Sequence, residues 1–283
     1  MIDKIEFNSL KRKDWLKQIA LIRNEYVDDK YKKELVFIFK ETLSPEHFQP
    51  IHLVTIACLI EFFVQKKHSI QISNASIETL FFEELKFKEY WNHSKDHVDS
   101  QNERIFNLWR IVENQKDIYA KEVEQYFKRN FFKGKDLSII TVSLVEAFYN
   151  VFDHAEAGGN AFSFIKYDEN NLILKVAICD FGKGIAKSVR DFDPVISSDK
   201  DALIKSIDVN FTVGSKSHNK GKGLDNILSC SDLARIVSNS ADLRKKKKVK
   251  VGTIDYNCQG TLIYFDLYLG HLEEEDILDE FDF

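Results

Sequence analysis

One segment, which begins at Glu146 and reads EAFYNVFDHA, narrows the possible folds of this chain more than any other. Glu146, Asn150 and His154 recur at i, i+4 and i+8, so a helix would place all three on one face. Apolar residues between them, such as Phe148 and Val151, can bury the opposite face. An acid, an amide and an imidazole on one helix face indicate either a polar surface stripe or a binding site.

A strand and a glycine-bearing turn are predicted next along the chain. The apolar run 172–179 contains β-branched residues and predicts a buried strand. Asp180 follows the run directly, and Gly182 and Gly184 come after it. A carboxylate at a strand end before two glycines suits a ligand that approaches the backbone closely.

A second glycine-bearing segment leads into another predicted helix. It is polar from Thr212 onward and contains Gly221 and Gly223. Backbone N–H groups at such a loop and helix start can bind phosphate oxygens. Farther on, Thr261 opens an apolar strand at 262–268.

The order and spacing of these four motifs resemble the GHKL group of ATP-binding proteins, which includes the gyrase B subunit and the histidine kinases. The likeness covers about residues 125–270. It implies an α/β sandwich in which helices cover a mixed sheet, with ATP and Mg²⁺ as cofactors. The wording around Glu146 is closest to that of the anti-sigma-factor serine kinases.

The resemblance also implies roles for individual residues. Glu146 would be the catalytic base, and Asn150 would hold Mg²⁺ through its side-chain oxygen, a hard ligand for a hard cation. Asp180 would accept a hydrogen bond from the adenine amino group, and Thr261 would bind near the adenine. The other implied nucleotide-binding residues lie in the two glycine boxes and in a lid over the phosphates: Gly182, Gly184, Thr212, Lys220, Gly221, Lys222, Gly223 and Leu224.

The N-terminal part of the chain predicts a smaller α/β unit. Strands at 36–39 and 69–73 alternate with helices at 51–65 and 76–85. This pattern resembles a STAS domain, the regulatory fold that partners anti-sigma kinases. Residues 46–52, which precede the main helix, include no serine or threonine that could accept phosphate. The resemblance therefore implies a docking or sensing unit.

Three parts of the chain follow from these patterns. They are an α/β regulatory or docking domain at 1–100, the ATP-binding domain at 105–270 and an acidic amphipathic tail at 271–283. A protein partner or substrate would dock on the N-terminal domain or on the tail. The basic run 244–248 is interpreted as a solvated hairpin turn, with a local anionic contact as the alternative.

Composition favours a cytoplasmic protein. The chain has 283 residues, of which 44% are hydrophobic, and this is enough for two cores. The net charge of −5 gives no global attraction to nucleic acid. The four cysteines form no CxxC pair, which argues against a metal or redox motif. Neither a signal peptide nor an apolar run of about 18 residues is present, so no membrane span is expected.

The favoured function is Mg·ATP binding with phosphoryl transfer or slow hydrolysis in signalling or regulation, by an ATPase or a serine/threonine kinase of the GHKL type. The alternatives are a non-catalytic ATP-dependent switch that controls a partner, and the ATPase component of a multi-gene bacterial system. Glu146 favours catalysis, because a pure binder does not need that carboxylate. None of the eight histidines has the sequence context of a phosphorylated histidine, which disfavours a histidine kinase. The sequence is compatible with a homodimer, and it does not identify the partner.

Overall fold

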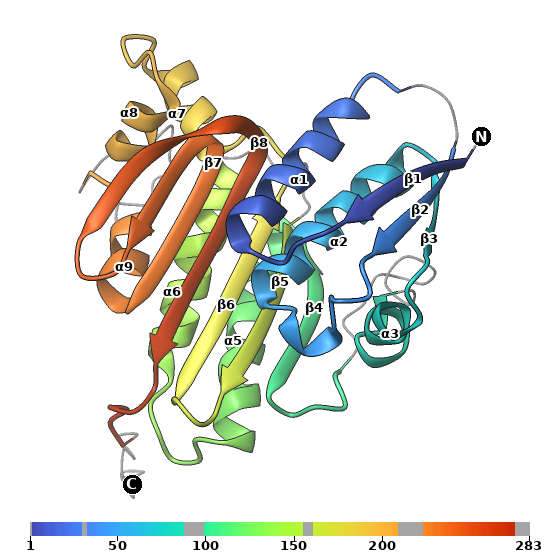
Figure 1. Ribbon diagram of the computed structural model, residues 1–283. Helices are drawn as coiled ribbons and strands as arrows, with labels where there is room; N and C mark the ends of the chain where they lie inside the picture. Colours follow the sequence, from blue (N-terminus) through green and yellow to red (C-terminus); the bar gives the residue numbers. More distant parts are fainter. Residues whose placement is uncertain (1, 30–32, 88–98, 155–160, 209–222, 275–283) are drawn as a thin grey trace, which may run out of the picture.

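The fold contains two β-sheets that lie one behind the other (Figure 1). The computed structural model describes residues 2–29, 33–87, 99–154, 161–208 and 223–274. One sheet has three parallel strands in the order β1-β2-β3. The other has five strands in the order β4-β5-β6-β8-β7. The chain is therefore an α/β protein, as predicted.

The N-terminal unit alternates strands and helices because parallel neighbours need a crossover connection. Its strands are β1 (Ile2–Phe7), β2 (Glu34–Phe39) and β3 (Ser69–Ile72). Its helices are α1 (Arg12–Glu25), α2 (Pro50–Gln65) and α3 (Ala75–Thr79), and α3 continues into a π-helical turn, Leu80–Glu84. The predicted strands and helices of this unit are all present. Two elements, β1 and α1, precede the first predicted element, which begins at Val36, and were not predicted.

The five-stranded sheet is antiparallel between all described neighbours, so the expectation of a mixed sheet is wrong. Its strands are β4 (Ile105–Ile111), β5 (Ala161–Asp168), β6 (Ile173–Asp180), β7 (Leu233–Lys245) and β8 (Val249–Tyr268). Two hairpins, β5–β6 and β7–β8, account for most of the pairing. The strand β7 runs in the same direction as β6, but β8 lies between them, so no parallel pair forms.

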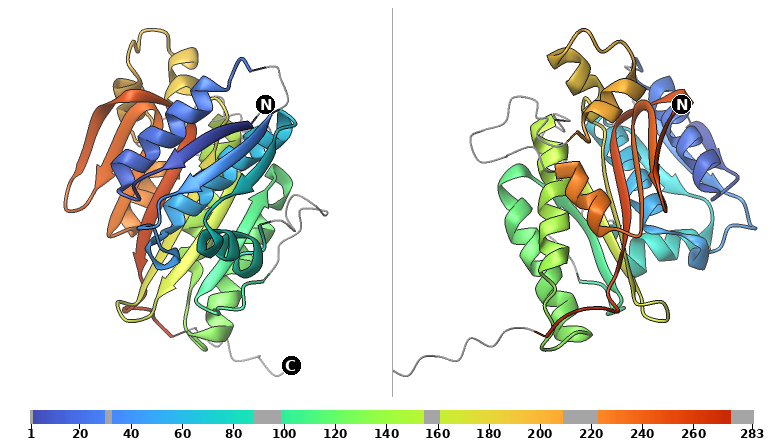
Figure 2. Two further views of the ribbon diagram at one scale, coloured as in Figure 1. Left: turned by 45° about the vertical axis from the view of Figure 1, so that its right-hand side comes forward. Right: turned by 90° about the vertical axis from the view of Figure 1, so that its left-hand side faces the viewer.

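Helices cover one face of this sheet (Figure 2). They are α5 (Lys116–Asn130), α6 (Ser138–Tyr149) and α9 (Gly223–Cys230), with α7 (Ile185–Phe192) and α8 (Asp199–Lys205) toward one end. Phe148 of α6 and Ile263 of β8 belong to the core between the layers. This face carries the segments for which the family resemblance implies a nucleotide site.

The N-terminal unit packs on the opposite face of the same sheet, as Figure 2 shows. The helix α2 contacts β5 and β6, and α1 contacts β8. Cys58 of α2 donates a hydrogen bond from Sγ to the carbonyl oxygen of Cys179, at 3.2 Å. Glu61, which is buried, forms an ion pair with Arg110 of β4 at 3.7 Å. The two units therefore share one hydrophobic core.

Several smaller predictions can be compared with the structure. All four cysteines are free, and three of them are buried. The basic run lies at the β7–β8 hairpin turn, and Arg244 pairs with Asp242 beside it. No helix in the described part of the chain has both the length and the apolar character needed to cross a membrane. Residues 275–283 of the acidic tail lie outside the described residues.

Candidate functional site

Asn150 lies where α6 changes into a π-helical turn, Asn150–His154. Such turns within helices occur frequently at functional sites. Asn150 is buried, and its Nδ2 donates a hydrogen bond to the carbonyl oxygen of Glu146 at 2.7 Å. Because Nδ2 is held by the helix, Oδ1 is the amide atom that can coordinate a cation.

Glu146 is half-buried on α6 and faces α9. Its Oε1 accepts a hydrogen bond from Nδ2 of Asn226 at 3.4 Å. Burial raises the pKa of Glu146, and the hydrogen bond from Asn226 opposes that rise. A carboxylate with a raised pKa is a better proton acceptor than an exposed one, which suits a general base. Asn226 is not among the site residues predicted from the sequence, because only the packing of α6 against α9 gives it a role.

Asp180 ends β6 with its carboxyl group fully enclosed. Its side chain is 1% exposed, and each oxygen accepts a backbone N–H group. Gly182 donates to Oδ1 at 2.7 Å, and Thr261 donates to Oδ2 at 3.2 Å. Burial raises the pKa of Asp180 to about 8, although both hydrogen bonds act to lower it. Two motifs that lie far apart in the sequence are thus joined at one carboxyl group.

Two glycines beside Asp180 have backbones that other residues rarely adopt. Gly184 has φ +88° and Gly260 has φ +87°. A Cβ on Gly184 would lie 2.6 Å from Oδ1 of Asn239, and one on Gly260 would overlap the carbonyl oxygen of Asp180. Gly182 lies in the same loop, and its carbonyl oxygen accepts a hydrogen bond from Gln259. Close backbone packing therefore requires glycine at positions 184 and 260.

Side chains of β7 and β8 accept hydrogen bonds from the first backbone N–H groups of α7. Ile185 donates its backbone N–H to Oγ1 of Thr261 at 3.2 Å. The next two N–H groups, of Ala186 and Lys187, each donate at 3.1 Å, to Oγ of Ser238 and to Oδ1 of Asn239. This helix start thus has its own acceptors and holds the glycine loop against the sheet. Thr261 has a structural part in this arrangement that the motif alone did not indicate.

Ser238 and Asn239 were missed in the sequence, yet a signal for them exists. They belong to the polar run Ser238–Ser240, which directly follows the apolar residues Ile236 and Val237. Asn239 has φ +53°, and the register of β7 against β8 shifts at this position. A β-bulge can re-aim side chains, and here the register shift accompanies the hydrogen bonds that Ser238 and Asn239 accept from the start of α7.

The structure brings the predicted motifs to the same face of the five-stranded sheet. Glu146 contacts α9 through Asn226, and the π-helical turn that contains Asn150 contacts α7. Gly223 and Leu224 are the first residues of α9, and Leu224 is buried in the core of this face. Four predicted residues of the lid lie outside the described residues: Thr212, Lys220, Gly221 and Lys222.

The described part of the chain contains no cluster of three or more His, Cys, Asp and Glu side chains that could hold a metal ion by themselves. A Mg²⁺ ion here would depend on Asn150 and on oxygens of a bound nucleotide. No protein-family model matches the chain, and a search of curated proteins found no match.

Proposed function

We propose that this chain binds Mg·ATP on the helix-covered face of the five-stranded sheet, in a GHKL-like site. The observation that supports this most is the Asp180 carboxyl group, which is fixed by Gly182 and Thr261. All three residues were implied by the resemblance, from motifs about eighty residues apart. Their meeting at one carboxyl group favours a shared origin of the pattern over coincidence.

Each remaining residue of the proposal has chemistry that suits its role. Bound Mg²⁺ would neutralise phosphate charge, and Asn150 would hold it through Oδ1. Asp180 offers carboxyl oxygens to the amino group of adenine in a water-excluded position. Glu146 would take the proton from the attacking hydroxyl group or water, because burial raises the pKa of its carboxylate. The proposed reaction is phosphoryl transfer or slow hydrolysis.

Isothermal titration with Mg·ATP tests nucleotide binding. The wild-type chain should bind saturably, and Asp180→Asn should bind at least about tenfold more weakly, because the amide puts a nitrogen that cannot accept a hydrogen bond where the carboxyl group has an oxygen. Asn150→Ala should remove the dependence of ATP affinity on Mg²⁺. Asp117→Asn, at an exposed position on α5, is the control and should bind as the wild type does. Absence of saturable binding by the wild type would refute the proposal.

A second candidate function is a binding switch without turnover. The shared core supports it, because the N-terminal unit packs directly on the back of the sheet that would hold the nucleotide. A change in the position of β6 or β8 on binding would reach α2 and α1 through these contacts. Turnover separates the two candidates, since only the enzyme releases or transfers phosphate.

A further inference from the structure

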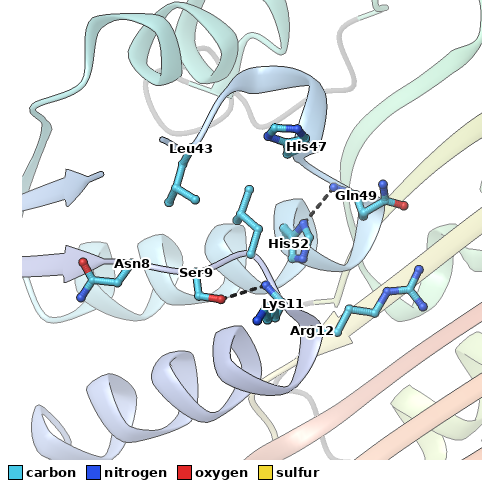
Figure 3. A pocket seen from close by; sticks show the side chains of 9 residues that line it. Asn8, Ser9, Lys11, Arg12, Leu43, His47, Gln49 and His52 are labelled. Carbon is cyan, nitrogen blue, oxygen red and sulfur yellow. Dashed lines mark hydrogen bonds between the residues drawn. The ribbon is translucent and has the colours of Figure 1, made fainter. Parts of the chain in front are cut away.

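A hollow of about 740 Å³ opens in the N-terminal unit, away from the proposed ATP site (Figure 3). One wall is the segment 8–12, which joins β1 to α1. The other wall comprises Leu43, His47, Gln49 and His52, around the start of α2. The hollow thus lies beyond the carboxyl ends of β1 and β2, the edge at which parallel α/β sheets commonly bind ligands.

His52 supplies a buried hydrogen-bond donor to this hollow. The residue is 1% exposed, and its Nδ1 accepts the backbone N–H of Gln49 at 2.9 Å. Burial and the nearby charge of Arg12 lower the pKa of His52 to about 4, so the ring is neutral at pH 7. Because Nδ1 is an acceptor, the single ring proton lies on Nε2.

Nε2 of His52 has no hydrogen-bond partner among the described residues. The backbone of Leu10 lies close enough to raise the pKa of this ring by a weak hydrogen bond, but within the described residues no acceptor meets the full geometric limits at Nε2. A buried donor without a partner is uncommon in a folded protein, because its lost hydration is not replaced. An acceptor atom of a ligand in the hollow would complete this site.

Positive charge lies next to this donor. Lys11 and Arg12 both line the hollow (Figure 3). The Arg12 guanidinium stacks 4.5 Å from the ring centroid of Tyr264 and donates from Nη2 to its hydroxyl group at 3.2 Å, which orients the side chain. The helix α1 begins at Arg12, and the side chain of its N-cap residue, Lys11, makes no capping hydrogen bond. Asp14, the acidic residue of this first turn, accepts a hydrogen bond from the hydroxyl group of Ser9. It is not among the residues that line the hollow.

We propose that the hollow binds a small anionic ligand, whose phosphate or carboxylate group is held by the Nε2–H of His52 and by the cations of Lys11 and Arg12. The N–H groups of His52, Lys11 and Arg12 can all donate hydrogen bonds to the oxygens of a phosphate or carboxylate group. The volume of the hollow suits a small molecule. Tyr264, which orients Arg12, belongs to the core on the N-terminal side of the sheet. The site is therefore distinct from the ATP site, and it does not depend on the proposed function.

The test follows the Nε2–H resonance of His52 by NMR while inorganic phosphate, ribose 5-phosphate or citrate is added to the full chain at constant ionic strength. Saturable shifts with the two phosphates indicate a phosphate ligand, and shifts with citrate alone indicate a carboxylate ligand; either supports the proposal. Arg12→Gln should weaken binding by about tenfold or more. Lys11→Gln, at an exposed position, should weaken it by about threefold.

Lys13→Gln is the matched control, because Lys13 is exposed on the same helix but does not line the hollow. It should change affinity by less than about 1.5-fold, since an exposed charge outside the site interacts weakly with the ligand. Absence of a saturable shift with all three compounds would overturn the proposal, as would equal weakening by Lys11→Gln and Lys13→Gln. The resonance of His52 and the Mg·ATP titration report on different sites, so failure of one proposal is distinguishable from failure of the other.

Discussion

The Asp180 carboxyl group shows how one residue can connect folding with ligand binding. Its pKa in the folded chain is about 8, well above the usual 3.8, because burial disfavours the charged form. The folded state therefore holds this proton more tightly than the unfolded state does. The resulting contribution to stability is complete below pH 4 and is lost as the pH rises through 8. A ligand that donates to the carboxylate would lower this pKa again.

Asp180→Asn should remove this pH dependence. Between pH 5 and pH 8 the free energy of unfolding of the wild type should fall, relative to the variant, by up to about 1.4 kcal/mol per pH unit. The variant itself should be less stable at pH 5, because its amide nitrogen cannot accept one of the two N–H groups. Urea unfolding at four pH values measures both effects. Parallel pH profiles for the two proteins would show that Asp180 is ionised in the folded chain.

Glu146→Gln should separate binding from turnover. The change preserves size and hydrogen bonding to Asn226 but removes the basic oxygen. Phosphate release or transfer should fall by roughly 10²–10⁴-fold, with ATP affinity within about twofold of the wild type. Glu122→Gln, at an exposed position on α5, is the control and should keep full turnover. Equal turnover in all three proteins would exclude Glu146 as the base.

Sequence reasoning at the residue scale identified side chains that local patterns make conspicuous. Asp180 at a strand end and the two glycines after it are examples, and the structure places them in one turn. Asn226, Ser238 and Asn239 escaped notice, because their partners lie on other elements. Only strand register and helix packing create those contacts, and neither is encoded in local spacing.

At the scale of elements, the attachment of α7 depends on backbone shape as much as on hydrogen bonds. The loop enters the helix through Gly184, whose Cβ position is surrounded by oxygens of Asn239, Gly260 and Ser238. Any side chain here would push α7 away from the three acceptors that satisfy its first turn. The loop after Asp180 would then lose its place at the sheet.

Substituting three glycines with alanine separates strain from steric overlap. Gly184→Ala combines positive φ with overlap and should cost about 3 kcal/mol or more of unfolding free energy. Gly134 also has positive φ but open space, so Gly134→Ala should cost about 1 kcal/mol. Gly252 has neither constraint, and Gly252→Ala should stay within about 0.5 kcal/mol of the wild type. Urea unfolding measures all three, and similar losses at 184 and 134 would contradict the role of overlap.

The sequence predicted whether a segment is a helix or a strand better than it predicted the relative direction of neighbouring strands. Apolar periodicity predicted α2 and the strand β6, because each buries a continuous apolar run. The π-helical turns were not predicted, since they depend on tertiary contacts at the helix end. The mixed sheet was a wrong prediction, because the position of β8 between β6 and β7 is set by long-range connectivity.

The whole molecule is organised around α2, which lies between the two sheets. Almost every residue of this helix is buried, including Ile56 and Phe63. The predicted division at 1–100 and 105–270 separates the two sheets, yet the helices α1 and α2 of the N-terminal unit are buried against the five-stranded sheet in one shared core. We expect the two halves to unfold together, because separating them would expose both faces to water.

Native-state hydrogen exchange tests this cooperativity. Amides of α2 and of β6 should open with the same free energy, within about 0.5 kcal/mol, as urea is raised. The exposed start of β1 is the internal control, since its edge position should allow local opening at lower free energy. Opening of α2 well before β6 would show that the N-terminal unit unfolds independently.

The position of β8 has a consequence for how the protein is made. This strand pairs with both β6 and β7, yet it is the last described strand to leave the ribosome. Until then β7 has no described strand partner, and the surface of α2 that faces the sheet lacks part of its cover. Until β8 is made, the nascent chain therefore exposes apolar surface and an unpaired strand edge. Chaperones bind chains in this state. We expect a chain that ends before Val249 to remain unfolded, because it would lack β8 and leave β7 without a described strand partner.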